Sequence, residues 1–409
     1  MARDVHPPRG MRDFLPAEKN RRDAVLAQII ESYQKHGFQQ IEAPALEDLV
    51  KLTASDGGDN EKLAFRVMKR GAELEQGLAV VGNDVQQIDQ LSDLGLRFDL
   101  TVPLTRYYAS NQAKLPRVFK AIQTGPVWRA ERPQKGRYRQ FVQCDIDVIG
   151  EATDLAEIEL LNASLDALKA IGLASAKIRV NHRALLTRTI ENLGVASEAA
   201  GRAMIVIDKL DKIGADGVVA ELAEQFTPEI ASNARVWLAT LADDLEIPDE
   251  LATIWSAISG VHPGKLRFDP TLVRGMGYYT GAIFEIEHPD SGSSIGGGGR
   301  YDGMVGRWLG KDVPAVGISI GFERVVDLVP AEAGKKSLLV LIYEAVDISK
   351  ALKVQGEAIA AGFEVRLEPR PKKLNSVLEE LAQQGFTHFA SLSGDAATFA
   401  ELEIRPLEP

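Results

Sequence analysis

The sequence predicts an α+β protein in which an antiparallel sheet with flanking helices carries a helical insertion and precedes a small C-terminal α/β domain. Strand-like segments in residues 1–330 follow one another or follow helices without regular alternation, which favours an antiparallel sheet over a Rossmann fold. Residues from about 176 to 262 are mainly helical in pattern, whereas residues 337–409 alternate strand and helix. A chain of 409 residues also exceeds what one hydrophobic core usually serves, so we expect two domains with these bounds.

The first domain opens with a predicted helix over residues 18–35, whose apolar residues recur at helical spacing up to a capping Gly37. The segment FQQIEAPALED follows, and its Pro44 cannot donate a ladder hydrogen bond, so we expect a bent or edge strand. The segments LRFDLT, FKAIQTGPVWR and RQFVQCDIDVIG are predicted to form an antiparallel meander. A long helix should follow over residues 155–172.

After the helical insertion, the pattern returns to strands. TLVRGMGYYTGAIFEIE and SIGGGGRYDGMV should be strands, and VGISIGFERVVDLV should be a strand that enters a helix. A short linker is expected over residues 331–336. Beyond it, SLLVLIY, FEVRLE and HFASLS are predicted strands, separated by helices over residues 349–362 and 374–385, which is the pattern of a separate α/β domain.

The composition excludes several classes of protein. Hydrophobic residues at 45% and charged residues at 26% are typical of a globular protein, and no apolar run is long enough to span a bilayer. The start, MARDVHPPRGMRDFLP, lacks the apolar core of a signal peptide, and the single Cys144 suits a reducing compartment, so we expect a cytoplasmic protein. Scattered histidines give no zinc spacing, so no metal site made by protein side chains alone is expected. The net charge of −11 argues against broad nucleic-acid binding but permits a local basic site.

Two features could bind anions. The stretch from Arg129 to Arg139, RAERPQKGRYR, concentrates cations in an acidic protein, although such a run taken alone is more typical of a solvated loop. The glycine run Gly296–Gly299 allows a ligand to approach the backbone and places Arg300 and Asp302 beside it. Four glycines are as often a flexible turn, and no Lys-Ser/Thr follows them, so they do not form a P-loop.

In combination, these motifs resemble the histidyl-tRNA synthetase family of class II aminoacyl-tRNA synthetases. FKAIQTGPVWRAERPQKGRYRQFVQCDIDVIG resembles motif 2 of that family, LVRGMGYYTGAIFE and SIGGGGRYDGMV resemble its two histidine-specific signatures, and AVGISIGFERVV resembles motif 3. PRGMRDFLP and the motif 1 stretch GFQQIEAPALED match as well, so the resemblance covers almost the whole chain in the right order. It implies a class II synthetase catalytic domain over residues 1–330 and a shortened anticodon-binding-like domain over residues 337–409.

The resemblance implies how ATP would bind. Arg129 resembles the arginine that holds the α-phosphate together with the histidine carboxylate, Arg274 one that approaches the same phosphate from the other side, and Arg324 one on the γ-phosphate. Phe141 would stack on adenine and Glu131 would lie near it, although an isolated phenylalanine in a strand is otherwise a core residue. Arg129 and Arg274 would be the catalytic residues, Mg²⁺ would arrive with ATP, and no protein nucleophile is required. Each arginine taken singly is more often a surface or salt-bridge residue.

The resemblance also implies a histidine pocket and a contact with tRNA. Carboxylates, a hydroxyl, an amide and phenols would surround the substrate's ammonium group and imidazole. The implied histidine-binding residues are Asp99, Thr101, Gln143, Asp147, Arg274, Tyr278 and Tyr279. The implied contacts with the tRNA acceptor end are Gln134, Arg137 and Arg139. Without the resemblance, the tyrosine pair would be interpreted as one buried and one exposed ring.

The implied function is a homodimeric histidine–tRNA ligase that uses histidine, ATP and histidine tRNA. The apolar helix face from Val25 to Tyr33 offers a dimer surface, unless it packs only within the subunit. Gly277 stands where most family members have aspartate, and the chain stops soon after AELEIRPLEP. Two alternatives therefore stay open, namely a non-catalytic regulatory subunit of histidine biosynthesis and a paralogue that activates an amino acid for an acceptor other than tRNA. The retained arginines Arg129, Arg274 and Arg324 disfavour the regulatory subunit.

Overall fold

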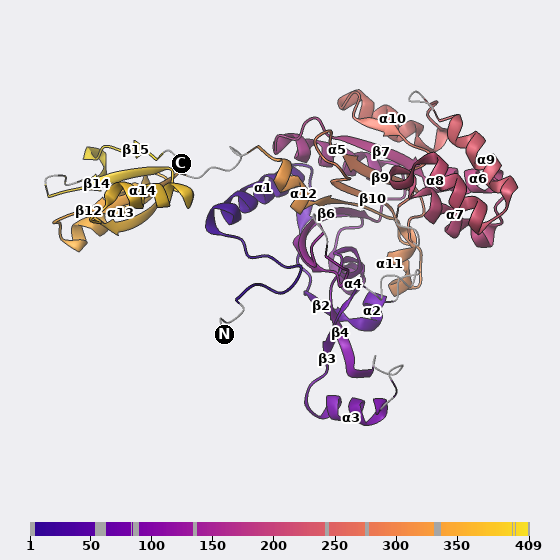
Figure 1. The fold of residues 1–409 in the computed structure, drawn as a ribbon, viewed down its shortest axis with the longest axis horizontal. Helices are drawn as coiled ribbons and strands as arrows, with labels where there is room; N and C mark the ends of the chain where they lie inside the picture. The colour runs from indigo at the N-terminus through magenta and orange to yellow at the C-terminus, as the bar shows by residue number, and fades with distance from the viewer. Residues whose placement is uncertain are drawn as a thin grey trace. The chain divides into compact units, whose positions relative to one another are not determined.

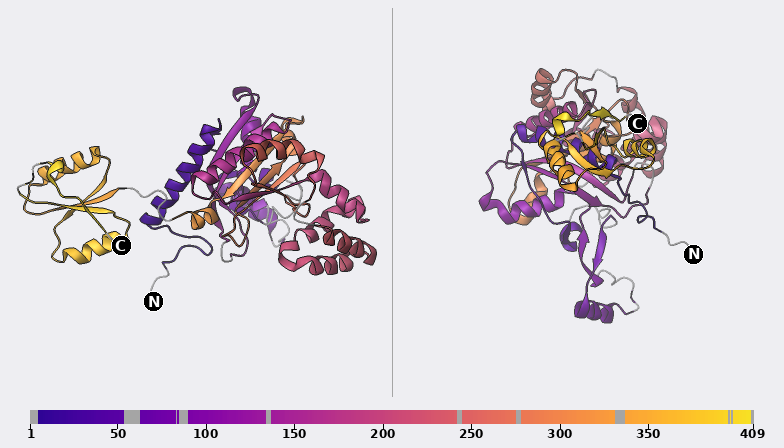
Figure 2. Two further views of the ribbon diagram at one scale, coloured as in Figure 1. Left: turned by 90° about the horizontal axis from the view of Figure 1, so that it is seen from above. Right: turned by 90° about the vertical axis from the view of Figure 1, so that its left-hand side faces the viewer.

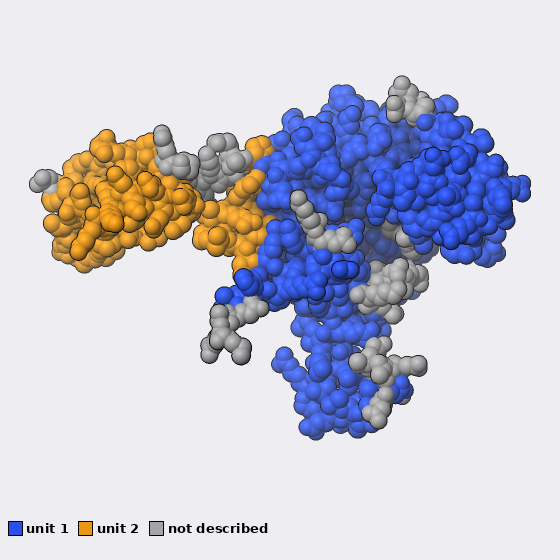
Figure 3. Space-filling model, in the orientation of Figure 1, with its two compact units in different colours: residues 1–12, 28–329 blue, residues 13–27, 330–409 orange. Residues whose placement is uncertain are grey.

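The protein forms two compact units (Figure 3). The computed structural model describes residues 5–53, 63–82, 84, 90–133, 137–241, 245–274, 278–330, 337–394, 396 and 398–407. Unit 1 comprises Met1–Arg12 and Gln28–Val329, and unit 2 comprises Asp13–Ala27 and Pro330–Pro409, so the division falls within helix α1 (Pro16–Lys35). In the part of the chain that is described, no helix is both long enough and apolar enough to cross a membrane.

An eight-stranded sheet forms the centre of unit 1 (Figure 1). Its strand order is β1-β5-β6-β11-β10-β9-β7-β8, with antiparallel pairing throughout except for the parallel edge pairs β1–β5 and β7–β8. This antiparallel centre with flanking helices confirms the predicted α+β fold class. The strands are β1 (Gln39–Gln40), β5 (Phe119–Trp128), β6 (Gln140–Ile149), β7 (Lys177–His182), β8 (Leu266–Phe268), β9 (Ala282–Glu287), β10 (Gly296–Arg300) and β11 (Ala315–Gly321).

Strand β6 carries an apolar and a polar face, because side chains alternate along a strand. Cys144, Ile146 and Val148 are fully buried on the apolar face. The helices α5 (Leu155–Ala170) and α12 (Phe322–Leu328) pack against this part of the sheet and help to exclude water from it. The other face of β6 carries polar side chains, namely Gln143, Asp145 and Asp147.

A three-stranded antiparallel sheet extends from the body of unit 1, together with a helix at its far end (Figures 1 and 2). Its order is β2-β4-β3, so β4 lies in the middle. The elements here are β2 (Leu46–Asp48), α2 (Leu49–Thr53), β3 (Phe65–Met68), α3 (Gly71–Val81) and β4 (Ser92–Leu96). The chain then returns to the large sheet through α4 (Thr101–Asn111) and the 3₁₀ helix Gln112–Lys114, and α4 packs against α11 (Asp302–Leu309).

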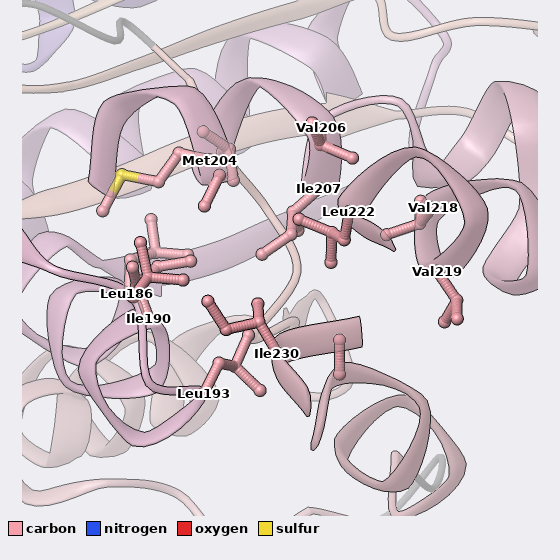
Figure 4. Close-up of a cluster of buried hydrophobic side chains, with 14 of the residues drawn as sticks. Leu186, Ile190, Leu193, Met204, Val206, Ile207, Val218, Val219, Leu222 and Ile230 are labelled. Atoms are coloured by element: carbon pink, nitrogen blue, oxygen red, sulfur yellow. The ribbon is translucent and has the colours of Figure 1, made fainter. Parts of the chain in front are cut away.

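A helical module follows β7 and has its own hydrophobic core (Figure 4). Side chains such as Leu186, Ile207 and Leu222 fill this core from successive helices, and helix α9 is capped by the Thr227 hydroxyl, which accepts from the Ile230 amide. The module contains α6 (Arg183–Asn192), the 3₁₀ helix Ser197–Ala199, α7 (Ala200–Ile207), α8 (Leu210–Gln225) and α9 (Pro228–Ala239). It ends with α10 (Asp249–Val261), which packs against α5, β7 and β8 instead of entering this core. The helices therefore begin later than residue 176, because residues 177–182 pair with β9 and β8 as a strand of the large sheet.

The C-terminal part of unit 2 is a four-stranded sheet in the order β13-β12-β14-β15. β12 pairs in parallel with both of its neighbours, which requires the helical connections that the sequence predicted. The elements are β12 (Leu338–Tyr343), α13 (Ile348–Ala360), β13 (Glu364–Pro369), α14 (Leu374–Gln383), β14 (His388–Leu392), the 3₁₀ helix Phe399–Glu401 and the antiparallel edge strand β15 (Arg405–Pro406). The predicted linker, residues 331–336, lies outside the described residues.

Three sequence-based strand predictions were wrong in part. β4 ends at Leu96 and belongs to the smaller sheet, so the predicted meander reduces to the β5–β6 hairpin. The segment LRFDLT instead starts helix α4, where the Asp99 carboxylate accepts from the Val102 amide and satisfies one free donor of the first turn. The signature beginning TLVRGMGYYTG enters a strand only at Ala282. The segment SIGGGGRYDGMV is a strand only over Gly296–Arg300, because helix α11 begins at Asp302, and its glycine run therefore lies in β10 rather than in a flexible turn.

Candidate active site

A cavity of about 1050 Å³ adjoins the polar face of β6 and extends to the first residues of α8 in the helical module. It brings together side chains from β6, from the loop before α4, from the segment before β9 and from helix α12. Most of the residues predicted to bind substrates line it, namely Asp99, Thr101, Arg129, Glu131, Arg137, Phe141, Gln143, Asp147, Arg274, Tyr278, Tyr279 and Arg324. The whole cavity lies within unit 1.

Three polar side chains of β6, Gln143, Asp145 and Asp147, line the cavity, and each has an oxygen that accepts no hydrogen bond in the described structure. The Gln143 amide nitrogen donates to the Ser319 hydroxyl at 3.1 Å. One carboxylate oxygen each of Asp145 and Asp147, and the amide oxygen of Gln143, are buried without a hydrogen-bond partner in the described structure. Because buried acceptors are nearly always satisfied in folded proteins, this group is suited to receive donors from a bound ligand.

Asp147 is held by Tyr301, which directly follows β10, a strand separated from β6 by β11. The Tyr301 hydroxyl donates to Asp147 Oδ1 at 2.5 Å. Burial raises the pKa of Asp147 to about 7, against the opposing effect of the Tyr301 hydrogen bond and with a smaller contribution from the negative charge of Asp99. Gly317 lies opposite Asp147 on β11, and a β-carbon there would come within 2.0 Å of Asp147 Oδ1. The carboxylate therefore occupies space that only glycine leaves open.

Arg129 lies between the adenine-side and histidine-side residues predicted from the sequence. Its Nε donates to the Phe98 carbonyl at 3.1 Å, and its guanidinium carbon is 5.0 Å from the centre of the Phe141 ring. Burial raises the pKa of Asp99, whereas the Val102 amide and the positive charge of Arg129 act to lower it. Arg129 is thus fixed by one nitrogen, with an aromatic ring on one side and a carboxylate near it.

Three further arginines that line the cavity, Arg137, Arg274 and Arg324, are close enough to one another to interact. Burial lowers the pKa of Arg324, and the positive charges of Arg137 and Arg274 lower it further. The Arg324 guanidinium donates to the Ser294 carbonyl. Mutually repelling guanidinium groups that are held together by the fold are stabilised by an anion between them, and a polyphosphate has the required charge and oxygen atoms.

The glycine run of β10 provides a flat surface for two of the predicted residues. A β-carbon on Gly297 would lie 2.6 Å from the guanidinium carbon of Arg274, and one on Gly299 would lie 3.0 Å from the Tyr279 ring. Both side chains therefore pack directly on the strand backbone. The sequence suggested that a ligand would approach the backbone of these glycines. In the structure, the side chains of Arg274 and Tyr279 lie there instead.

Tyr278 and Tyr279 both line the cavity and are both half-buried. Their ring centres are 4.5 Å apart in an edge-to-face arrangement. Burial raises the pKa of both phenols, so each stays protonated and can donate a hydrogen bond. The expectation of one buried and one exposed ring therefore does not hold.

Arg139 is the one predicted residue in the described part of the chain that lies outside the cavity lining. Its Nε donates to the Glu131 carbonyl at 3.0 Å. Gln134 lies outside the described residues, as does Gly277. Arg300, which flanks the glycine run, forms a buried two-pronged ion pair with Glu157 of α5, so it joins helix to sheet.

Sequence reasoning missed several residues of the cavity. Asp145 could have been found, because it continues the alternation of Gln143 and Asp147 on β6. Tyr301 and Glu285 gave no such signal, since each reaches the cavity through strand pairing that the sequence does not show. Glu323 accepts from the Val142 amide at 3.0 Å and pairs with Arg12, so it fixes the cavity wall next to Arg324.

The donor set of the cavity does not form a protein metal cage. Within the described ranges, no group of three or more His, Cys, Asp or Glu side chains is placed to hold a metal ion. Arginines instead supply the positive charge of the cavity.

Comparisons with known proteins identify the family. The model of the histidyl-tRNA synthetase family matches residues 10–325. The chain is 51% identical over 433 aligned residues to the histidine–tRNA ligase of Leifsonia xyli subsp. xyli, and the alignment covers 100% of this chain and 99% of that protein.

Two solved structures share the fold. The histidyl-tRNA synthetase of Nostoc sp. PCC 7120 superposes with a TM-score of 0.76 at 25% identity, covering 99% of this chain and 95% of that one. A protein of Bacillus halodurans C, described as an ATP phosphoribosyltransferase regulatory subunit/histidyl-tRNA synthetase, has the same TM-score of 0.76 at 20% identity, covering 97% of this chain and 100% of that one. At 20% identity, the similarity to the second structure shows only that the fold is shared. Since the family model spans most of the chain and the Leifsonia relative matches it from end to end, the chain belongs to the histidyl-tRNA synthetase family.

Proposed function

We propose that the protein is a histidine–tRNA ligase, which activates histidine with ATP to histidyl-adenylate and transfers histidine to the 3′ end of its tRNA. One observation carries the proposal. A single cavity is lined both by carboxylate and amide oxygens without partners in the described structure and by several guanidinium groups, in a chain 51% identical to a histidine–tRNA ligase. Such a cavity suits an amino acid with an ammonium group and a nucleoside triphosphate bound side by side.

In the first step, a histidine carboxylate oxygen attacks the α-phosphorus of ATP. A new oxygen–phosphorus bond forms, the bond to the β-phosphate oxygen breaks, and pyrophosphate leaves with its electron pair. Arg129 and Arg274 act as the catalytic residues by stabilising the negative charge that builds on the α-phosphate oxygens. Arg324 binds the γ-phosphate, and Phe141 and Glu131 bind the adenine end. Positioning by these fixed groups replaces a protein nucleophile.

The histidine substrate lies against β6. Asp99, Thr101 and Gln143 receive the α-ammonium group, which carries three donors for their oxygens. Asp147 and the tyrosine pair face the imidazole, where the carboxylate accepts from a ring N–H and a phenol donates to the other nitrogen. The unpartnered oxygens of Gln143 and Asp147 support this placement.

In the second step, the terminal ribose hydroxyl of tRNA attacks the carbonyl carbon of the adenylate, and AMP leaves. A phosphate oxygen of the adenylate accepts the hydroxyl proton. Arg137 at the cavity and Arg139 beside it, with Gln134, contact the acceptor end as phosphate-binding groups. The C-terminal domain of residues 337–409 binds the anticodon region. Mg²⁺ bound with ATP would neutralise part of the phosphate charge, and Arg129, Arg274 and Arg324 of the cavity would hold the phosphates.

The protein acts as a homodimer in the cytoplasm. The helix face predicted to form the interface offers little free surface, because Val25, Ile29 and Tyr33 are each 0% exposed within the single chain. The extending three-stranded region instead carries large exposed apolar residues, which support an interface there. These residues are Leu46, Val50, Met68, Leu78 and Val80. Light scattering at micromolar concentration should give twice the 44.5 kDa chain mass, and the chain mass alone would contradict a dimer. The single cysteine suits a reducing compartment.

The test of the proposed activity is histidine-dependent exchange of pyrophosphate into ATP, followed in the same preparation by charging of histidine tRNA. Exchange with charging is the expected result. Exchange without charging would favour a paralogue with another acceptor. Absence of exchange with histidine and with every other amino acid would overturn the ligase and favour the regulatory subunit.

A further inference from the structure

Glu285 on β9 divides its two carboxylate oxygens between two arginines. Oε2 accepts from Arg274 Nη1 at 2.5 Å, and Oε1 accepts from Arg179 Nη1 at 3.0 Å. The side chain of Glu285 is only 17% exposed, so these contacts are shielded from solvent. A carboxylate that is shared in this way fixes the position of one arginine relative to the other.

The hydrogen bonds of Arg274 leave most of its guanidinium free for a ligand. In the described structure its contacts with Glu285, with the Ser294 hydroxyl at 3.3 Å and with the Gly296 carbonyl at 3.4 Å all use Nη1. Nε and Nη2 therefore stay available on a side chain that is 32% exposed at the cavity. The absence of a β-carbon on Gly297 lets the group lie flat on β10. Glu285 thus anchors one nitrogen of Arg274 and leaves the others for a phosphate.

Arg179 on β7 is itself held by carboxylates from three segments. Besides Glu285, it donates through Nε to Asp269 Oδ2 at 2.8 Å and through Nη1 to Asp211 Oδ2 at 2.9 Å. Asp269 is fixed in turn by the Thr271 amide at 2.9 Å and the Thr271 hydroxyl at 2.6 Å. The Arg179 side chain is 10% exposed, so it cannot leave this cluster without leaving an unpaired buried charge.

Asp211 belongs to the first turn of α8, in the helical module. The end of α7 and the start of α8 also border the cavity, through Ile207, Asp208, Leu210 and Asp211. A continuous set of ion pairs therefore runs from the helical module to the phosphate-facing arginine of the large sheet. It passes through Asp211, Arg179, Glu285 and Arg274 in that order.

We propose that Glu285 is the positioning residue of Arg274, and that Arg179 ties this carboxylate to the helical module through Asp211. The proposal rests on the proposed function, in which Arg274 meets the α-phosphate. The seating of the helical module then decides whether Arg274 is correctly aimed, so any partner that shifts the module changes the rate of histidine activation.

Positioning and simple electrostatics predict opposite results for Glu285→Gln. If Glu285 only contributed negative charge, its removal would strengthen ATP binding and leave kcat unchanged or higher. If it positions Arg274, kcat for pyrophosphate exchange should fall about tenfold while KM for ATP does not rise. In the Arg274→Ala background, Glu285→Gln should have no further effect, because the residue through which it acts is gone. Multiplying losses in the double variant would overturn the proposal.

The helical module offers a matched pair of variants for the second half of the proposal. Asp211 and Asp216 both lie on α8, and each accepts from an arginine at 2.9 Å, but the partner of Asp216 is Arg235 within the module. Asp211→Asn should lower kcat about three- to tenfold. Asp216→Asn should leave it unchanged. Equal effects of the two variants would remove Asp211 from the path.

The orientation of the Arg274 side chain can also be determined by a measurement that does not depend on enzymatic activity. Crystal structures of the full-length wild type and of Glu285→Gln, both without ligand, should show the Arg274 guanidinium on Gly297 in the first and displaced from it in the second. An undisplaced Arg274 would overturn the positioning role whatever the assay gives. If the wild type shows no exchange, the proposed function fails, whereas this structural comparison still decides the positioning role.

Discussion

Strands β6 and β12 both carry buried side chains on two faces, but those of β12 are apolar on both faces, whereas those of β6 are polar on one face. In β12, Leu339 and Leu341 enter one apolar cluster with α13, while Val340 and Ile342 enter another with α14. In β6, only one face is apolar, and the other presents Gln143, Asp145 and Asp147 to a cavity. Buried polar oxygens without a partner occur on β6, and none of those found in the described residues lies in the C-terminal sheet.

The difference separates a strand that stabilises the fold from a strand that binds a ligand. Apolar burial on both faces lowers the free energy of the folded chain by itself. Burying acids without partners raises it, as the upward pKa shifts of Asp99, Asp145 and Asp147 record. The polar face of β6 is therefore retained at a cost in stability, which a bound substrate offsets.

The largest expected effect is on the apolar strand. Leu341→Ala should destabilise the C-terminal sheet by about 2–5 kcal/mol, because it opens a cavity in a fully packed core. All four tryptophans lie between residues 128 and 308, outside that sheet. In urea, circular dichroism should therefore show an early transition that tryptophan fluorescence does not report, while histidine-dependent exchange is retained. Coincident early transitions would mean that the two regions unfold as one.

On the polar side, Arg129→Ala should lower the rate of exchange by about 10²–10³-fold, since one charge-stabilising donor at the α-phosphate is lost. The melting temperature should change little, because the only hydrogen bond of its guanidinium in the described structure is to the Phe98 carbonyl. Arg188→Ala, which removes a half-exposed ion pair with Glu250 in the helical module, is the matched control and should retain activity. Similar activity in both variants would contradict the role of Arg129.

Gly317→Ala should lower both the stability of the protein and its affinity for histidine. The added methyl group would meet Asp147 Oδ1 at 2.0 Å and must displace the carboxylate from Tyr301. We expect a loss of about 1–3 kcal/mol in stability and a raised KM for histidine, with KM for ATP nearly unchanged. Gly303→Ala, where a β-carbon meets nothing within 4 Å, is the control. Equal effects on both substrates would place Asp147 away from histidine.

The smallest expected effect is an increase in stability, and it is expected for Asp147→Asn. The pKa of Asp147 is raised from 3.8 to about 7, so the folded state holds this proton more tightly than the unfolded state, and the resulting stability is lost as the pH rises through 7. Asp147→Asn cannot ionise, so its melting temperature should exceed that of the wild type by an amount that grows as the pH rises from about 4 to about 7 and is largest near pH 8. Exchange should be lost. A variant that is less stable at pH 8 would show that burial does not dominate at this site.

Much of the candidate site could be predicted from the sequence, because its residues sit in long motifs of fixed order. Phe141, Gln143 and Asp147 follow the period of one strand, so their shared face could be inferred before any pairing was known. Glu285 and Tyr301 could not be inferred, since they join the cavity only through the register of β9, β10 and β11. That the chain itself buries Val25, Ile29 and Tyr33 could not be inferred, because an apolar helix stripe looks the same whether the subunit or a partner covers it.

By itself, the sequence determined the family, the α+β class and the nearly complete run of elements from β12 to β14, because local periodicity and chain-ordered motifs are properties of neighbouring residues. The tertiary structure decided which glycines leave room for Arg274 and Asp147, which acids lose their water and shift in pKa, and which carboxylates join Arg179 to Arg274. Those properties depend on distances between segments far apart in the chain, and electrostatic interactions and steric exclusion act through space rather than along the backbone.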